Sequence, residues 1–165
     1  MLMAVAALAT SCRSSGSGGG SSASPAQFEA GILTLAANDA GRGGEVQMKV
    51  RSGKGQDRFN VIIAQFKYDS ARIKLKGCEI AASVGAGTAS NKQLLFVEEN
   101  PGMVRAVVTG SVEALPGDAD IFGCTFAVAA DAQPGQATIR LEADVSDTDF
   151  ADHAFRDEVT LAVNG

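Results

Sequence analysis

The sequence predicts an all-β sandwich of about nine short strands. Three observations lead to this fold class. β-prone runs recur at short and regular intervals, and clusters of Gly, Pro, Asn and Asp separate them. No window carries the long apolar period of 3.6 residues that an amphipathic helix requires. This combination is typical of a sandwich of antiparallel strands.

The longest β-prone run covers residues 59–68 and predicts the central strand. Ile62, Ala64, Phe66 and Tyr68 share one face at period 2, and Phe59, Val61 and Ile63 share the other. A strand that is apolar on both faces over half of its length is typical of the middle of a sheet. Asp69 and Ser70 then end the run with a turn signal.

The remaining strands follow from the same alternation of apolar and polar residues. In chain order we expect strands at 32–35, 45–51, 59–68, 73–75, 94–97, 103–109, 122–129, 137–143 and 158–163. The run at 94–97 is continuously apolar and predicts a buried strand, and the alternation at 122–129 turns Cys124 into the core. Gly77 and Cys78 break the phase of the strand that begins at residue 73, which predicts a β-bulge there.

Length and composition bound the class of protein. The chain has 165 residues, 45% hydrophobic and 20% charged, which suits one globular domain, expected at 28–165. The formal net charge is −5 and the pI is about 4.8. Nucleic-acid binding requires grouped Lys and Arg to neutralise phosphates, and no such cluster is present, so we expect no nucleic-acid partner.

The N-terminal segment is expected to direct export. Residues 1–9 are almost wholly apolar and too short to span a bilayer, as in the apolar region of a secretory signal. Small residues then lead to Cys12, which resembles a bacterial lipobox, although Leu8 stands one place early and no positive charge precedes the apolar region. We expect residues 1–12 to be the signal and lipobox and Cys12 to carry the lipid; an ordinary cleaved signal is the alternative.

A linker is expected at 13–27, with a Gly/Ser-rich run that has nothing to bury. Its twelve residues at 13–24 would hold the domain on the order of 20 Å from the anchor. The predicted location is the cell envelope, where the lipid alone attaches the protein to a bacterial membrane, at the outer membrane or the cell surface, facing an oxidising compartment.

Three stretches in order resemble a cohesin-type domain. They are FKYD (66–69) followed by IKL (73–75), NPGMVRAV (100–107), and the late run from GD (117–118) through FAV (126–128), ADAQPG (130–135) and ATIRL (137–141). The likeness covers most of residues 28–165, and Ser70 stands where the family often has Pro. It implies a flattened jelly-roll β-sandwich that binds dockerin modules through one sheet face, with no contact residue carried over.

Two cysteines remain once Cys12 is assigned to the lipid. An even pair in an exported domain favours a disulfide between Cys78 and Cys124, which in the cohesin-like topology would meet across the core. The alternative is two buried free thiols that pack as small hydrophobic groups.

Asp144, Asp147, Asp149 and Asp152 are the candidate Ca²⁺ ligands. Their spacing is not that of an EF-hand, so we expect an acidic solvated loop and no bound metal. His153 is the only His and is expected at the surface beside this loop. No nucleophile motif and no marked carboxylate pair is present, so we expect no catalytic residues and no cofactor.

The expected function is a non-catalytic, extracytoplasmic binding module with a protein partner, for which a dockerin-like module is the candidate. The alternatives are polysaccharide binding by the same sandwich and a structural role in the envelope. Sugar platforms use exposed aromatic rings, and this chain has no Trp and one Tyr, Tyr68, on the predicted inner face, which disfavours the polysaccharide.

Overall fold

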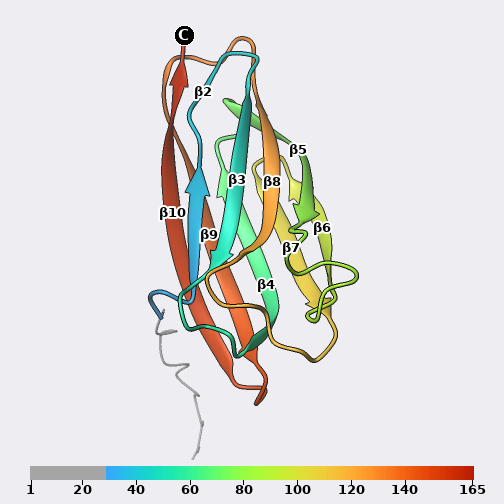
Figure 1. The fold of residues 1–165 in the computed structure, drawn as a ribbon. Coiled ribbons are helices and arrows are strands. Elements are labelled where there is room, and N and C mark those ends of the chain that lie inside the picture. Colours follow the sequence, from blue (N-terminus) through green and yellow to red (C-terminus); the bar gives the residue numbers. More distant parts are fainter. Residues whose placement is uncertain (1–28) are drawn as a thin grey trace, which may run out of the picture.

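A computed structural model describes residues 29–165, which form two stacked β-sheets and no helix (Figure 1). The strands are β1 (Leu33–Ala37), β2 (Ala40–Gly41), β3 (Glu45–Ser52), β4 (Phe59–Tyr68), β5 (Ile73–Ile80), β6 (Lys92–Asn100), β7 (Met103–Gly110), β8 (Asp120–Val128), β9 (Gly135–Asp147) and β10 (Asp152–Asn164). The jelly-roll sandwich predicted from the sequence is therefore confirmed. Within the described range there is no helix of the length and hydropathy needed to cross a membrane.

The two sheets differ in size. The larger sheet has the strand order β2-β10-β9-β4-β7-β6, and the smaller has the order β1-β3-β8-β5. Every pairing is antiparallel except the short parallel contact of β2 with β10. Strands β6 and β5 lie at the edges of their sheets on one side of the sandwich, while β1 and β2 lie at the opposite edges.

Strand β4 lies inside the larger sheet, between β9 and β7, as its sequence predicts. Its residues Ile62, Ala64, Phe66 and Tyr68 are buried against the smaller sheet. Edge-to-face ring contacts connect the two layers, with Phe66 against Phe122 at 5.7 Å and Tyr68 against Phe126 at 5.0 Å between ring centroids. Such aromatic pairs contribute about 0.5–1.5 kcal/mol beyond the burial of their surface.

Two local predictions are confirmed. The ladder between β5 and β8 shifts register between Leu75 and Gly77, which is the bulge expected from the phase break. The turn between β6 and β7 contains Gly102 at φ +93°, where a Cβ atom would lie 2.8 Å from the carbonyl oxygen of Tyr68. Only glycine fits this turn, because the backbone conformation is left-handed and the neighbouring strand is close.

Several predicted boundaries are wrong. Strand β6 is nine residues long and lies at an edge, so the run at 94–97 is not a buried strand. Strands β9 and β10 continue into the predicted acidic loop, because Val145 and Phe155 extend the buried alternation on both sides of the turn. The short strand β2 lies between the strands predicted at 32–35 and 45–51, where the sequence predicted none.

Candidate functional site

Exposed aliphatic side chains lie side by side on the outer face of the larger sheet. The strand registers place Leu95 of β6 opposite Val107 of β7, and Val107 opposite Ile63 of β4. Ile63 is 46% exposed and Leu95 61%, while Val107 is half-buried between them. We call these three residues the apolar row. Three aliphatic side chains at neighbouring cross-strand positions on an open sheet face are a feature of interaction surfaces, because single exposed apolar residues are common and contiguous ones are not.

Charged side chains border the apolar row. Arg105 lies two residues before Val107 on the same face of β7 and pairs with Glu99, with Nε to Oε1 at 3.0 Å. Further along the face, Glu142 forms ion pairs with Arg156 at 3.1 Å and with Lys67 at 3.9 Å. These pairs are exposed to solvent and contribute at most about 1 kcal/mol each to stability. The pairs of Glu142 give the face a polar rim toward β9 and β10, and the Arg105–Glu99 pair borders the apolar row on β7 and β6.

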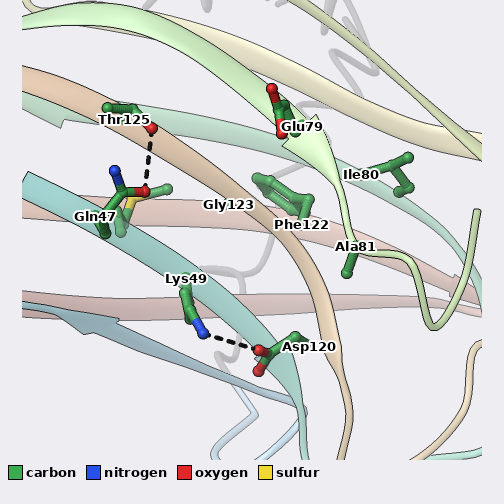
Figure 2. Close-up of a pocket in the computed structure, with 10 residues that line it drawn as sticks. Gln47, Lys49, Glu79, Ile80, Ala81, Asp120, Phe122, Gly123 and Thr125 are labelled. Atoms are coloured by element: carbon green, nitrogen blue, oxygen red, sulfur yellow. Dashed lines mark hydrogen bonds and ion pairs between the residues drawn. The ribbon is translucent and has the colours of Figure 1, made fainter.

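The outer face of the smaller sheet is polar and carries a hollow of about 200 Å³ (Figure 2). The hollow lies over Gly123 of β8, where the sheet presents no side chain. Gln47 and Thr125 flank it and are joined by a hydrogen bond of 3.1 Å, and Lys49 pairs with Asp120 at 3.2 Å. Phe122 lies beneath the hollow and is buried. Of the described residues that line the hollow, none is an exposed aromatic, so the surface resembles solvated sheet more than a sugar platform.

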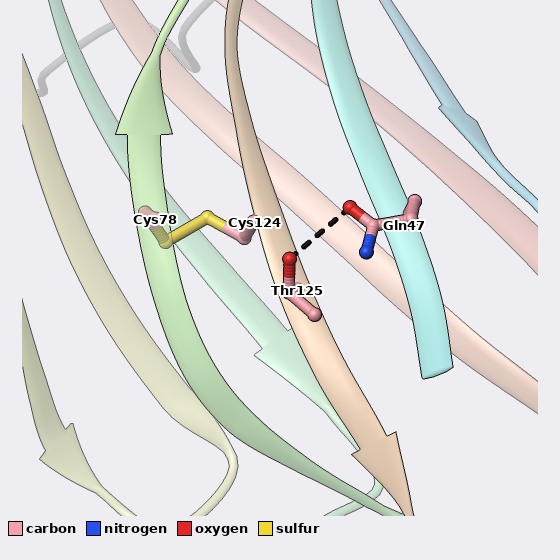
Figure 3. Close-up of a disulfide and its surroundings, with 4 residues drawn as sticks. All are labelled: Gln47, Cys78, Cys124 and Thr125. Carbon is pink, nitrogen blue, oxygen red and sulfur yellow. Dashed lines mark hydrogen bonds between the residues drawn. A yellow bond between two sulfur atoms is a disulfide. The ribbon is translucent and has the colours of Figure 1, made fainter. Parts of the chain in front are cut away.

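The predicted pair Cys78 and Cys124 forms a disulfide in the structure (Figure 3). The two residues are direct cross-strand neighbours on β5 and β8, with their Cα atoms 4.0 Å apart. The expectation that they would meet across the core is wrong, because β5 and β8 belong to the same sheet. The bridge therefore holds the edge strand β5 to β8 within the smaller sheet and leaves the larger sheet unlinked.

The four candidate Ca²⁺ ligands do not converge. Asp144 lies on the outer face of the larger sheet opposite Ile63, while Asp147 is buried and faces inward. Asp147 accepts the N–H groups of Asp149 and Ala151, both at 2.9 Å, and so closes the β9–β10 turn. Asp152 accepts the hydroxyl of Ser146 at 2.6 Å. Residues 29–165 contain no group of three or more His, Cys, Asp or Glu placed to hold a metal ion.

His153 lies between two carboxylates and is not the surface residue that the sequence suggested. Its Nδ1 lies 2.8 Å from Glu29 and its Nε2 lies 3.1 Å from Asp147, while its ring packs edge-on against Phe59. The hydrogen bonds to Glu29 and Asp147 raise the pKa of His153 above its usual value. The pKa of Asp147 is lowered, mostly by the hydrogen bond from the backbone N–H of Ala151 and next by the hydrogen bond with His153. We call His153, Glu29 and Asp147 the histidine clamp; it ties the first described residue to the β9–β10 turn.

Lys92 is a feature that sequence reasoning missed. It begins β6, yet it is buried, and its Nζ donates to the carbonyl oxygen of Ser111 at 2.6 Å. Burial lowers the pKa of Lys92, partly offset by the charge of Glu113. A Lys at a strand start gives no sequence signal of burial, since its usual place is the surface. The predicted lipid site, Cys12, and the predicted linker at 13–27 lie outside the described residues.

The fold has clear relatives among solved structures, although neither protein-family models nor curated proteins match the sequence. The chain is similar to a cohesin module from the family 33 glycoside hydrolase of Clostridium perfringens, with a TM-score of 0.67 and 16% identity, covering 81% of this chain and 96% of that one. It is similar to the structure of a type I cohesin–dockerin complex from Clostridium thermocellum, with a TM-score of 0.63 and 16% identity over 80% and 99% of the two chains.

A third relative is the non-cellulosomal cohesin from the archaeon Archaeoglobus fulgidus, with a TM-score of 0.61 and 14% identity over 81% and 91% of the two chains. At these identities the likeness establishes the fold. The sandwich is of the cohesin type, as the ordered motifs at 66–75, 100–107 and 117–141 suggested.

Proposed function

We propose that this protein is a non-catalytic binding module that engages a protein partner, of the dockerin class, through the outer face of the larger sheet. The observation that carries the proposal is the apolar row of Leu95, Val107 and Ile63. A flat face with an apolar patch and a charged rim suits a protein surface, because protein interfaces combine an apolar centre with a polar border. Small-molecule sites are concave and enclosed, whereas the hollow of about 450 Å³ beside Ile63 on this face, between Arg105 and Glu142, is open to solvent.

The fold supports the class of partner. Structures with the same fold include cohesins solved in complex with dockerins. Fold similarity alone is an analogy, so the apolar row and its rim carry the argument for this chain.

The test is a binding titration of the full chain against a panel of dockerin modules. We expect at least one module to bind, and Ile63→Lys to weaken it by more than tenfold, because a charge would be buried at the centre of the contact. Gln47→Lys, on the outer face of the smaller sheet, is the matched control and should bind as the parent does. Binding that Ile63→Lys leaves unchanged would place the contact elsewhere.

We further propose that Cys12 anchors the module to the outer side of a bacterial membrane. The supports are the lipobox-like residues that precede Cys12, the linker that follows it, and a disulfide that suits an oxidising compartment. Cys12→Ser should abolish metabolic lipid labelling and move the protein from the membrane fraction to the soluble fraction. A parent protein that is already soluble and unlabelled would exclude the anchor.

Polysaccharide binding is the second candidate, and one observation favours it. The hollow over Gly123 offers amide, hydroxyl, ammonium and carboxylate groups within the volume of about 200 Å³. A glycan array distinguishes the two proposals: hits that Gln47→Ala removes and Ile63→Lys leaves intact would favour the sugar. A structural role in the envelope, the third possibility raised by the sequence, predicts neither kind of ligand.

A further inference from the structure

The edge of the larger sheet at β6 is open along its most apolar stretch (Figure 1). Leu95 is 61% exposed, Phe96 44% and Val97 54%, and the three follow one another in the chain. Exposed apolar edge strands are rare in soluble proteins because their free N–H and C=O groups accept another strand. Proteins blunt such edges with Lys, Pro or bulges, and none of these stands between residues 94 and 98.

On the opposite side of the sandwich, other segments cover the edges of the sheets, unlike the edge at β6. There β2 covers the end of β10 through Val163 and Asn164, and the N–H of Leu35 donates to Asp157 at 2.9 Å. The N–H of Glu29 also donates to the carbonyl oxygen of Ala154 on the edge of β10. The β6 edge has one comparable cover among the described residues, where the N–H of Lys92 donates to Val84 at 2.7 Å.

That one hydrogen bond fixes which groups face the open edge. The N–H of Lys92 points to Val84 and therefore away from β7. In an antiparallel ladder the direction alternates, so every second residue turns its N–H and C=O to the same side. Leu94, Phe96 and Glu98 therefore present their backbone groups to the open edge, while Leu95 and Val97 bond to β7.

We propose that a second copy of this chain pairs with the β6 edge, antiparallel about a two-fold axis at Phe96, to form one sheet across two molecules. With Phe96 opposite its symmetry mate, Leu94 falls opposite Glu98. Every edge-facing N–H and C=O in the stretch 94–98 then finds a partner. A two-fold axis is the commonest symmetry by which identical chains associate, and it allows one strand to pair with its own copy.

The side chains fit the same register. Leu95 falls opposite Val97 of the second copy on the outer face, in the close, non-hydrogen-bonded type of pair that brings side chains together. Glu99 falls opposite Gln93, so neither glutamate faces another glutamate. The loop residue Val84 covers the edge at Lys92, which confines the pairing to 94–98. A contact of this length is small, so we expect a reversible dimer with a dissociation constant roughly in the micromolar range.

The test uses the full chain carrying Cys12→Ser, and it needs no partner protein, so it stands apart from the proposed function. Sedimentation velocity should show a monomer–dimer equilibrium that depends on concentration. Phe96→Pro should shift it to monomer, because the proline removes an N–H that faces the open edge and does not bond to β7. Ile63→Lys is the control on the same sheet face and should leave the dimer intact.

The register is tested by cross-linking. An antiparallel hydrogen-bonded pair has its Cα atoms about 5.5 Å apart, within the range that a disulfide spans. Phe96→Cys should therefore form a covalent dimer on mild oxidation, whereas Val112→Cys, in a loop and even more exposed at 74%, should not. A chain that stays monomeric at all concentrations would overturn the proposal, as would equal cross-linking of both variants. If the parent is monomeric and Phe96→Pro loses binding to a dockerin module, the β6 edge pairs with a strand of the partner protein and the dimer proposal is wrong.

Discussion

The two outer faces of the sandwich are built differently. The smaller sheet presents polar side chains, a hollow over Gly123 and the Lys49–Asp120 ion pair, and its edge strand β5 is fixed by the disulfide. The larger sheet presents the apolar row, has no disulfide among the described residues, and ends at the open edge of β6. The polar side chains of the smaller sheet are solvated by water. The larger sheet leaves apolar surface exposed, which is unfavourable unless a partner covers it.

The largest expected effect concerns the core that both faces share. Phe66→Ala removes a fully buried ring that contacts Phe122 from the other sheet. We expect the free energy of unfolding to fall by about 3–5 kcal/mol, since the cavity is added to the lost burial. Denaturant titration measures this value. A loss below about 1 kcal/mol would mean that the two sheets do not pack as described.

The disulfide gives the next effect and separates the two sheets. Cys78 and Cys124 are separated by 46 residues in the chain. We expect the double variant Cys78→Ala/Cys124→Ala to lose about 2–5 kcal/mol of stability, because the bridge restricts the unfolded chain. Binding to the larger sheet should be unchanged at low temperature. Two free thiols in protein purified without reductant, measured by mass spectrometry, would contradict the bridge.

The histidine clamp gives the smallest effect, and its sign follows from the pKa shifts. The pKa of His153 is raised, so its stabilisation is complete below the unfolded value of about 6.5 and is lost as pH rises through the folded value. The pKa of Asp147 is lowered, so its stabilisation is complete above the unfolded value of about 3.9 and is lost as pH falls through the folded value.

The clamp should therefore stabilise most between about pH 4 and 6.5. The charged groups that face His153 are Glu29, Asp147 and Arg58, and Arg58 partly opposes the raised pKa. His153→Gln should flatten the upper limb of a plot of thermal midpoint against pH by a small amount. Ser146→Ala, on the outward side of the neighbouring strand β9, should keep that limb. If the upper limb is unchanged in His153→Gln, the histidine clamp does not contribute to the pH dependence of stability.

Much of the fold could be predicted because it rests on local alternation. The inward phase of Phe66 and Cys124 and the bulge at Gly77 follow from residues close in sequence. The order of strands does not, since it depends on contacts between distant segments. For that reason the run at 94–97 was expected to be buried, whereas it lies on the edge strand β6. The disulfide was expected to cross the core, whereas it joins the neighbouring strands β5 and β8 of one sheet.

The candidate site was the part least accessible to sequence. Ile63, Val107 and Leu95 come from three strands, and only the registers bring them together. An outward Ile in a central strand looks the same in sequence whether another layer covers it or not. The clamp was missed for a similar reason, because Glu29 and His153 lie 124 residues apart in the chain.

The most direct test of the central claim compares the two faces in one binding experiment. A dockerin module that binds the full chain is titrated against Ile63→Lys and Gln47→Lys, with both variants shown to unfold within about 0.5 kcal/mol of the parent. We predict that Ile63→Lys weakens binding more than tenfold and Gln47→Lys leaves it unchanged. The reverse pattern, with Gln47→Lys losing binding and Ile63→Lys keeping it, would contradict the assignment of the partner to the larger sheet.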